Sequence, residues 1–202
     1  MTSGYAQTNT FLKVTTPLGA DVLVLDAMEG SEGISEMFKL TLHMRAMSSD
    51  LDATKVMGNA VTVKLEIPDG PQRYFNGIAT RFIQSGGEDG MAHYSAEVVP
   101  KLWLLTLSRN RAIWQTKTVP DIIKAVLGEF GITFEAKLTG TYTALDYCVQ
   151  HDETSFEFIS RLMETAGIFY FFTFKDGAHT MVLADATTAH VACTDASTVR
   201  FY

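Results

Sequence analysis

The sequence predicts an α+β fold that is mainly antiparallel β, and three observations carry this prediction. Apolar and polar side chains alternate along residues 38–45, 61–67 and 94–98, which indicates strands with one buried and one solvated face. Residues 119–130 instead place their apolar side chains at helical spacing. Residues 168–184 form two apolar runs around an Asp-Gly pair, which is typical of a β-hairpin.

The alternating pattern dominates residues 11 to about 107. Pro68-Asp69-Gly70-Pro71 ends one predicted strand, and the glycine-rich residues 85–90 indicate a turn before another. Many short strands separated by turns are typical of a barrel or a sandwich rather than of a parallel sheet. We therefore expect a first domain over residues 1–108, built as an antiparallel barrel or sandwich.

The helical spacing belongs to a second unit. Thr118 is placed to cap a helix that tolerates Pro120 in its first turn, and Gly131 ends this helix. A helix of this length is marginal in water on its own, so its apolar stripe must dock on a sheet or on another helix. We therefore expect an α+β domain over residues 109–202.

Residues 147–185 hold the most specific local signals. A short strand is predicted at residues 147–150, and Thr154 with Glu157 forms a capping box for the helix that follows. Gly167 stands where a left-handed cap ends that helix. The apolar face of the helix consists of Ile159, Leu162, Met163 and Ala166.

Two strands near the end of the chain need a separate interpretation. Residues 169–174 are apolar on both faces, which favours burial on both sides, in a core or a subunit interface. A carbohydrate platform or a membrane-inserting edge is the alternative. Residues 197–202 are predicted to form a further strand, with Val199 and Phe201 on one face.

Composition and charge argue against several classes of function. The net charge of the 202 residues is −7, and no basic run offers the surface that nucleic-acid phosphates need. The first residues lack a secretory signal pattern, and no apolar segment is long enough to span a membrane. Cys148 and Cys193 are the two cysteines. Their wide spacing fits free thiols in a reducing compartment, with a single disulfide left open.

We predict no catalytic, cofactor-binding or metal-binding site. The histidines form no metal-binding pair, and no nucleophile elbow or nucleotide loop occurs. The acidic cluster that includes Glu153 and Glu164 leaves a cell-wall glycan hydrolase as an alternative, because paired carboxylates hydrolyse glycosides. However, acidic residues are expected near a helix start, and Glu153 or Glu157 beside Arg161 indicates structural pairing. We therefore expect a protein that is not an enzyme.

The chain resembles the hub region of the valine-glycine repeat protein G (VgrG) family, the spike proteins of bacterial type VI secretion. Upstream matches lie at residues 33–38, 75–79, 100–105 and 119–123. One departure is Leu145-Asp146, where the family usually has an Arg-Glu pair. The matching residues of the strand–helix region, expected to be structural, are Gln150, Glu153, Phe156, Phe158, Arg161, Leu162, Glu164 and Gly167.

The resemblance implies a fold and a function. The first domain is then a tube-like β-barrel followed by an α+β domain, as in the hub proteins of contractile phage tails. The implied assembly is a homotrimer that stacks on the hexameric Hcp tube protein within the baseplate. A spike-tip protein and effectors would bind through regions outside this chain, which we expect to be an N-terminal fragment. The implied location is the bacterial cytoplasm during assembly, followed by export through the machine. The hub of a contractile phage tail or a phage-derived particle is the alternative.

Overall fold

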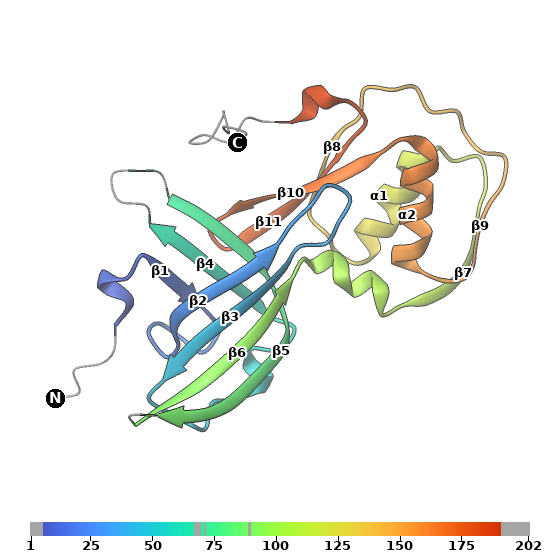
Figure 1. The fold of residues 1–202 in the computed structure, drawn as a ribbon. Helices are drawn as coiled ribbons and strands as arrows, with labels where there is room; N and C mark the ends of the chain where they lie inside the picture. The colour runs from blue at the N-terminus through green and yellow to red at the C-terminus, as the bar shows by residue number, and fades with distance from the viewer. Residues whose placement is uncertain (1–5, 67–69, 71, 89, 191–202) are drawn as a thin grey trace, which may run out of the picture.

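A computed structural model describes residues 6–66, 70, 72–88 and 90–190 (Figure 1). The strand expected at residues 197–202 and Cys193 lie outside the described residues, as does most of the turn expected at 68–71. The strands are β1 (Leu12–Thr15), β2 (Val24–Ser31), β3 (Lys39–Ala46), β4 (Ala60–Glu66), β5 (Gln72–Glu88), β6 (Met91–Val99), β7 (Arg109–Trp114), β8 (Phe134–Lys137), β9 (Cys148–Thr154), β10 (Phe169–Lys175) and β11 (Ala178–Ala184). The α-helices are α1 (Val119–Glu129) and α2 (Ser155–Ala166), and the short 3-10 helices are η1 (Gln7–Asn9), η2 (Ala53–Lys55), η3 (Lys101–Thr106) and η4 (Thr187–Ala189).

The first six strands form one antiparallel sheet in the order β1-β4-β5-β6-β3-β2. The sheet curls until its edge strands β1 and β2 come within 8 Å of each other between Cα atoms. Among the described residues these two edges share no ladder of hydrogen bonds. The expected fold class is therefore confirmed, with a curled, barrel-like antiparallel sheet.

Alternation along β3 and β6 follows the prediction. Leu40, Leu42 and Met44 are at most 5% exposed, whereas Lys39 and His43 point outward. Strand β4 departs from its expected pattern, because its polar residue Thr62 is only 6% exposed. The hydroxyl of Thr62 accepts a hydrogen bond from Asn76 on β5, at 2.8 Å, and a buried polar group is tolerated when it is paired in this way.

The turn expected over residues 85–90 is wrong for most of that range. Strand β5 continues to Glu88 and pairs with β6, with register shifts at Ala79/Arg81 and Gln84/Gly86. Gly87 pairs with Ala92 in this ladder, and a Cβ there would lie only 2.6 Å from the carbonyl oxygen of Met91. The glycines thus lie at a β-bulge and at a close approach between two strands, not in an open loop.

The remaining elements build a second layer around α1 and α2, which pack against each other. Strands β10, β11 and β8 form a sheet in which β10–β11 is an antiparallel hairpin and β11–β8 is parallel. Strands β7 and β9 form a separate antiparallel pair. Strands β7 and β8 are not among the elements predicted from the sequence. Figure 1 shows the β10–β11 hairpin extending from the helices across the six-stranded sheet.

Both helices begin and end as their sequences predict. Thr118 accepts a hydrogen bond from the backbone N–H of Asp121, and α2 has the complete capping box of Thr154 and Glu157. Gly167 closes α2 in the left-handed conformation, with φ of 68°. The apolar side of α2 is buried, with Ile159, Leu162 and Met163 at most 5% exposed.

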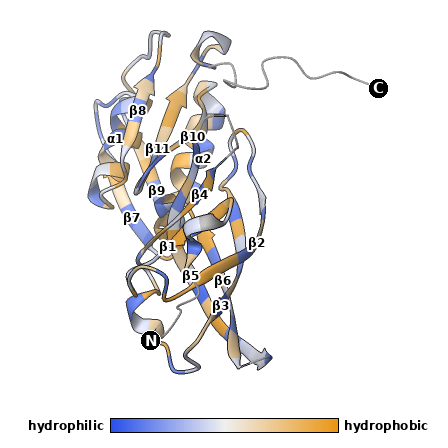
Figure 2. Ribbon diagram, turned by 90° about the vertical axis from the view of Figure 1, so that its left-hand side faces the viewer, coloured by the Kyte–Doolittle hydropathy of each residue, from blue (hydrophilic) through white to orange (hydrophobic). Residues whose placement is uncertain are grey.

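The apolar hairpin β10–β11 lies between two hydrophobic clusters. One cluster fills the curled sheet, and the other lies between α1, α2 and β11. Figure 2 shows much of β11 in the colours of hydrophobic residues, and Met181 and Leu183 on it are fully buried. Phe172 packs against both clusters, and Phe174 packs against the sheet cluster.

We predict that Gly77→Ala destabilises the protein by about 1–3 kcal/mol, because overpacking of a tight contact typically has this effect. A Cβ at Gly77 would lie 2.4 Å from the carbonyl oxygen of Val99, so the β5–β6 backbone must shift. The free energy of unfolding in urea measures this loss. The matched control is Gly128→Ala on α1, where a Cβ meets nothing within 4 Å. It should raise stability by up to about 1 kcal/mol. Equal stability of the Gly77→Ala variant and the wild type would refute the prediction.

Candidate functional site

Phe38 is the centre of an aromatic cluster that joins the six-stranded sheet to the β10–β11 hairpin. Its ring meets those of Phe172 and Phe174 edge-on, both at centroid distances of 5.1 Å, and that of His179 at 5.8 Å. Phe75 on β5 completes the contact, 5.6 Å from Phe174. Aromatic pairs of this kind add roughly 0.5–1.5 kcal/mol each beyond the burial of their surface. The cluster therefore fixes how the two layers sit on each other.

His179 adds a polar link across the same contact. The backbone N–H of Lys101 donates to its Nε2 at 3.0 Å, so the proton lies on Nδ1, which donates to Oδ1 of Asn76 at 2.9 Å. Asn76 donates onward to Thr62. Burial, together with the charge of Lys101, lowers the pKa of His179 to about 4. The neutral imidazole is the form that fits this network.

The eight residues that match the family motif lie where β9 enters α2 and along α2 itself. They are Gln150, Glu153, Phe156, Phe158, Arg161, Leu162, Glu164 and Gly167. Phe158 and Leu162 are buried among the helices, and Phe156 packs at their margin. Gln150 is 2% exposed and donates to the carbonyl oxygen of Glu153 at 3.1 Å. Their common structural role stays a prediction.

Glu153 and Arg161 form a bidentate ion pair, with three N–O distances between 2.6 and 3.1 Å. Arg161 also donates to the carbonyl oxygen of Val149 at 2.6 Å and lies 5.1 Å from the centre of the Phe158 ring. Hydrogen bonding from Arg161 lowers the pKa of Glu153. A general acid for glycoside cleavage needs the opposite shift.

Glu164 lies in different surroundings from Glu153. It is exposed and, with Phe156, lines a cavity of about 190 Å³, to whose lining Glu153 does not belong. Glu157 is engaged in the capping box of α2. Glu153 and Glu164, the two carboxylates that a glycan hydrolase would use, thus do not line a common cavity. Nothing in this arrangement favours the hydrolase alternative.

Asp185, which is not among the residues predicted from the sequence, holds a loop against the end of β11. Its carboxylate accepts from the backbone N–H groups of Gly140 and Thr139, at 2.7 and 2.9 Å, and from the hydroxyl of Tyr142 at 2.8 Å. These bonds, led by that from Gly140, hold the pKa of Asp185 far below its usual range. The partners lie about 45 residues earlier in the chain, so no local sequence signal identifies them.

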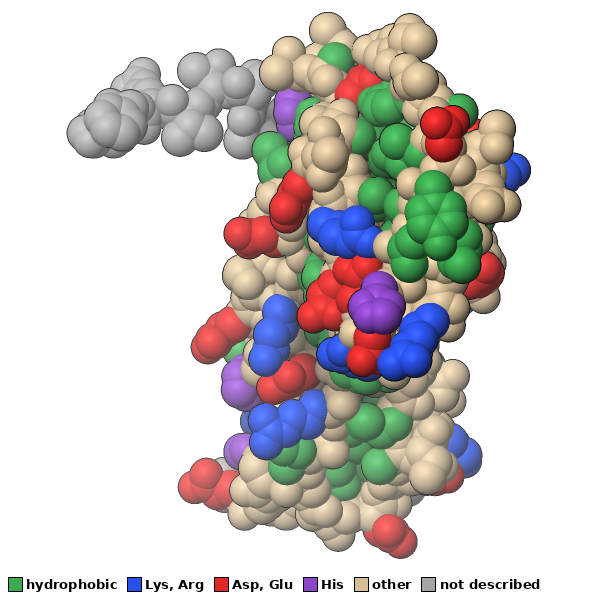
Figure 3. Space-filling model, turned by 90° about the vertical axis from the view of Figure 1, so that its right-hand side faces the viewer, with side chains coloured by type: hydrophobic (Ala, Val, Ile, Leu, Met, Phe, Trp, Pro, Cys, Tyr) green, Lys and Arg blue, Asp and Glu red, His purple; other side chains and the backbone are tan. Residues whose placement is uncertain are grey.

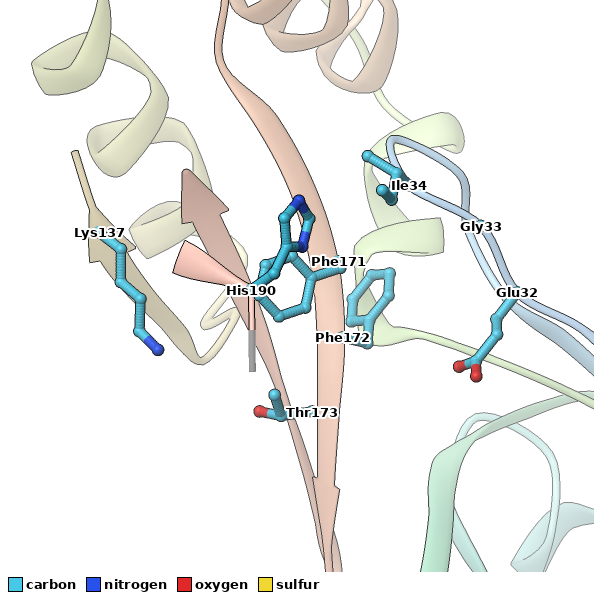
Figure 4. A pocket seen from close by; sticks show the side chains of 8 residues that line it. All are labelled: Glu32, Gly33, Ile34, Lys137, Phe171, Phe172, Thr173 and His190. Carbon is cyan, nitrogen blue, oxygen red and sulfur yellow. The ribbon is translucent and has the colours of Figure 1, made fainter. Parts of the chain in front are cut away.

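The outward face of β10 lines a hollow of about 390 Å³. In Figure 4 the rings of Phe171 and His190 lie together at its centre, 5.7 Å apart, between Lys137 on one side and Ile34 on the other. Phe171 is only half-buried, and Thr173 on the same face is exposed. Within the described residues this face is covered only in part, by His190, so it is not buried in the core of the chain, and burial in a subunit interface stays a prediction.

Charged side chains of both signs gather on the face over β7 and β9, as Figure 3 shows. Arg111 lies 3.8 Å from Asp152, whose main-chain oxygen accepts a hydrogen bond from Arg109. Ile113 and Tyr147, on or beside the same pair of strands, are 62% and 58% exposed. This surface combines exposed apolar residues with a charged rim, an arrangement seen where proteins bind one another.

In the described part of the chain, no group of three His, Cys, Asp or Glu side chains is arranged to hold a metal ion. None of the helices described is both long and apolar enough to cross a bilayer. Cys148 is a buried free thiol, and burial raises its pKa.

The curled sheet joined to an α+β layer is the architecture of tail hub and spike proteins. A component of the type VI secretion system from E. coli, described as structurally similar to the T4 bacteriophage tail proteins gp27 and gp5, matches with a TM-score of 0.76. That match has 24% identity over 89% of this chain and 50% of the other. A 43 kDa tail protein of prophage MuSo2 from Shewanella oneidensis matches with a TM-score of 0.53 and 15% identity, over 78% of this chain and 54% of the other.

The family follows from the sequence. The profile of the phage tail baseplate hub (GPD) family matches residues 31–202, and the chain belongs to this family. It is 40% identical, over 97% of its length, to the type VI secretion system spike protein VgrG1a of Pseudomonas aeruginosa, and 39% identical over 98% to VgrG1b of the same bacterium. The chain spans only 31% and 27% of these two relatives. The resemblance to VgrG proteins stated above is thereby confirmed.

We predict that Glu153→Gln lowers stability by about 1 kcal/mol or less at pH 7, because the pair is partly exposed and screened by solvent. The pKa of Glu153 is lowered in the folded protein, so its contribution is complete above the usual glutamate pKa. It is lost as the pH falls through the lower, folded value. Urea unfolding between pH 3 and pH 7 measures the difference between the two proteins. If the stability difference between the wild type and Glu153→Gln did not depend on pH, the ion pair with Arg161 would not be what stabilises the charged form of Glu153.

We predict that His179 makes the fold sensitive to mild acid. Its pKa is about 4 in the folded protein and about 6.5 in an unfolded chain, so the unfolded state takes up the proton first. Stability is complete above about pH 6.5 and falls toward pH 4, by on the order of 2–3 kcal/mol.

The control for this prediction is His179→Gln, which removes the titrating group. Unfolding free energies at pH 7 and pH 4.5 should differ less in the variant than in the wild type. The same difference in both proteins would show that other groups cause the acid sensitivity.

Proposed function

We propose that this protein is a structural hub component of a type VI secretion spike. The observation that carries the proposal is the near-complete match to spike proteins at 40% identity, on a fold shared with tail hub proteins. The structure supports a mechanical role, because the two layers are fixed to each other by the aromatic cluster around Phe38 and by the His179 network. A rigid joint of this kind suits a part that transmits force.

The finer parts of the proposal concern assembly. Three copies would form a closed ring, and the ring would stack on the hexameric Hcp tube protein inside the baseplate. A rotationally symmetric ring has a fixed size, which is what a starter for a tube requires. The exposed apolar and charged face over β7 and β9 is available for such contacts. Effectors and a spike-tip protein would bind through other parts of the full-length protein, which would leave the cell through the machine itself.

We further propose a boundary at residue 108, between a tube-like domain and an α+β domain that residues 109–202 begin. The presence of two hydrophobic clusters, one in the sheet and one among the helices, supports a division near this residue, with Leu102 and Leu105 on η3 already part of the helix cluster. The family-motif residues around α2 would then serve the framework of the second domain. We also propose that the chain is not an enzyme, since its named relatives are spike and tail proteins and Glu153 is held by Arg161.

The test is deletion of the gene in its source bacterium. Release of the Hcp tube protein into the medium should stop, while the tube protein still accumulates in the cells. The wild-type gene should restore release. Leu162→Asp should not, because it buries an unpaired charge at a side chain that is 5% exposed.

The matched control is Leu107→Asp, at a side chain that is 64% exposed, and it should restore release. Unchanged release of the tube protein after deletion would sink the secretion proposal. If phage-like particles instead lost their infectivity or their tails, the protein would be the hub of a phage tail.

A further inference from the structure

A cavity of about 190 Å³ lies between α2, the loop that precedes β3 and the start of β10. Its apolar walls include Phe156 and Met163, and its polar lining includes Ser35, Ser160 and Glu164. A single water needs only on the order of 10–15 Å³ of such space. The cavity is therefore large enough for a long side chain to enter from solvent.

Tyr170 lines the cavity and is the feature that the fold does not explain. Its side chain is 2% exposed, yet its hydroxyl has no hydrogen-bond partner among the described residues. The residue is held in place by its neighbours, since its ring packs edge-on against Phe172 at 5.8 Å and its carbonyl oxygen accepts from the N–H of Ser35 at 2.8 Å. A buried hydroxyl without a partner is costly, so this position indicates a partner that arrives from outside.

The charges around the cavity indicate the sign of that partner. Glu164 is at its lining, and Glu36 is near enough to act on Tyr170, whose pKa rises to about 12 through burial and through the charge of Glu36. Among the described residues, neither carboxylate forms an ion pair, and the lining holds no lysine or arginine. The polar groups present are hydroxyls and a carboxylate, which accept hydrogen bonds from a cation.

We propose that this cavity receives the side chain of a lysine or an arginine from a partner protein. The aliphatic stem of such a side chain would pack against Phe156 and Met163, while its charged end pairs with Glu164 and, after a small shift of the lining, with the buried Tyr170 hydroxyl. An apolar side chain would leave the hydroxyls unpaired, and an acidic one would be repelled by Glu164 and Glu36. The identity of the partner protein rests on the proposed function. Binding of a basic side chain to the cavity does not, because it is measured with this protein alone.

The probe for the test is N-acetyl-arginine methylamide, with the uncharged citrulline counterpart as its matched control. Amide NMR signals of Ser160, Gly167 and Ile168 in the ¹⁵N-labelled chain report on the cavity. We expect saturable shifts with a Kd on the order of millimolar, as for other ligands of this size with few contacts. The citrulline probe should bind at least tenfold more weakly, and added salt should weaken the arginine probe.

Two variants assign the binding to the cavity. Glu164→Gln should weaken the arginine probe several-fold, whereas Glu129→Gln, at the exposed end of α1, should not change it. Tyr170→Phe should keep or raise the thermal midpoint, because it removes an unpaired hydroxyl, and should still weaken binding at least threefold.

Absence of saturable shifts would overturn the inference, as would equal binding of the two probes or unchanged binding to Glu164→Gln and Tyr170→Phe. This outcome is distinct from failure of the proposed function. If the arginine probe binds to the cavity but deletion of the gene leaves release of the tube protein unchanged, the inference about the cavity stands and the proposed role in secretion is refuted.

Discussion

The structure depends on the contact at which the ring of Phe38 meets the β10–β11 hairpin. Phe38 comes from the loop before β3, and Phe172 and Phe174 come from a hairpin that closes more than 130 residues later. The hairpin is itself part of the sheet that α1 and α2 cover. One side of β10 therefore completes the core of the curled sheet, while its partner β11 completes the core of the helices. The core of the curled sheet is therefore closed by a hairpin that belongs to the second layer.

The polar groups at this contact add selectivity to the aromatic packing. Aromatic rings tolerate several packing angles. By contrast, the series of hydrogen bonds from Lys101 through His179 and Asn76 to Thr62 requires each donor to face its acceptor. A displaced hairpin would leave these buried groups unpaired, at a cost of roughly 1–3 kcal/mol for each. The network therefore selects one relative position of the two layers.

Local signals in the sequence predicted the parts of the fold that depend on neighbouring residues. The capping box of Thr154 and Glu157, the left-handed Gly167 and the alternation in β3 all involve positions a few residues apart. Strands β7 and β8 escaped prediction because they are short and mostly exposed, so no buried face marks them. Within the candidate site, the pairing of Glu153 or Glu157 with Arg161 was anticipated, and the structure selects Glu153. The link between His179 and Asn76 joins residues 103 positions apart, which no spacing pattern reveals.

The position of the hairpin late in the chain has a consequence for the order of synthesis. All six strands of the curled sheet leave the ribosome before β10 does, and at ~5–20 residues per second the wait lasts several seconds. During that time Phe38 and Phe75 lack the rings of Phe172 and Phe174 that cover them in the finished protein. The nascent sheet thus exposes an aromatic surface until the second layer arrives. The two hydrophobic clusters therefore do not correspond to two independent folding events, because Phe172 and Phe174 from the end of the chain pack on the cluster of the sheet.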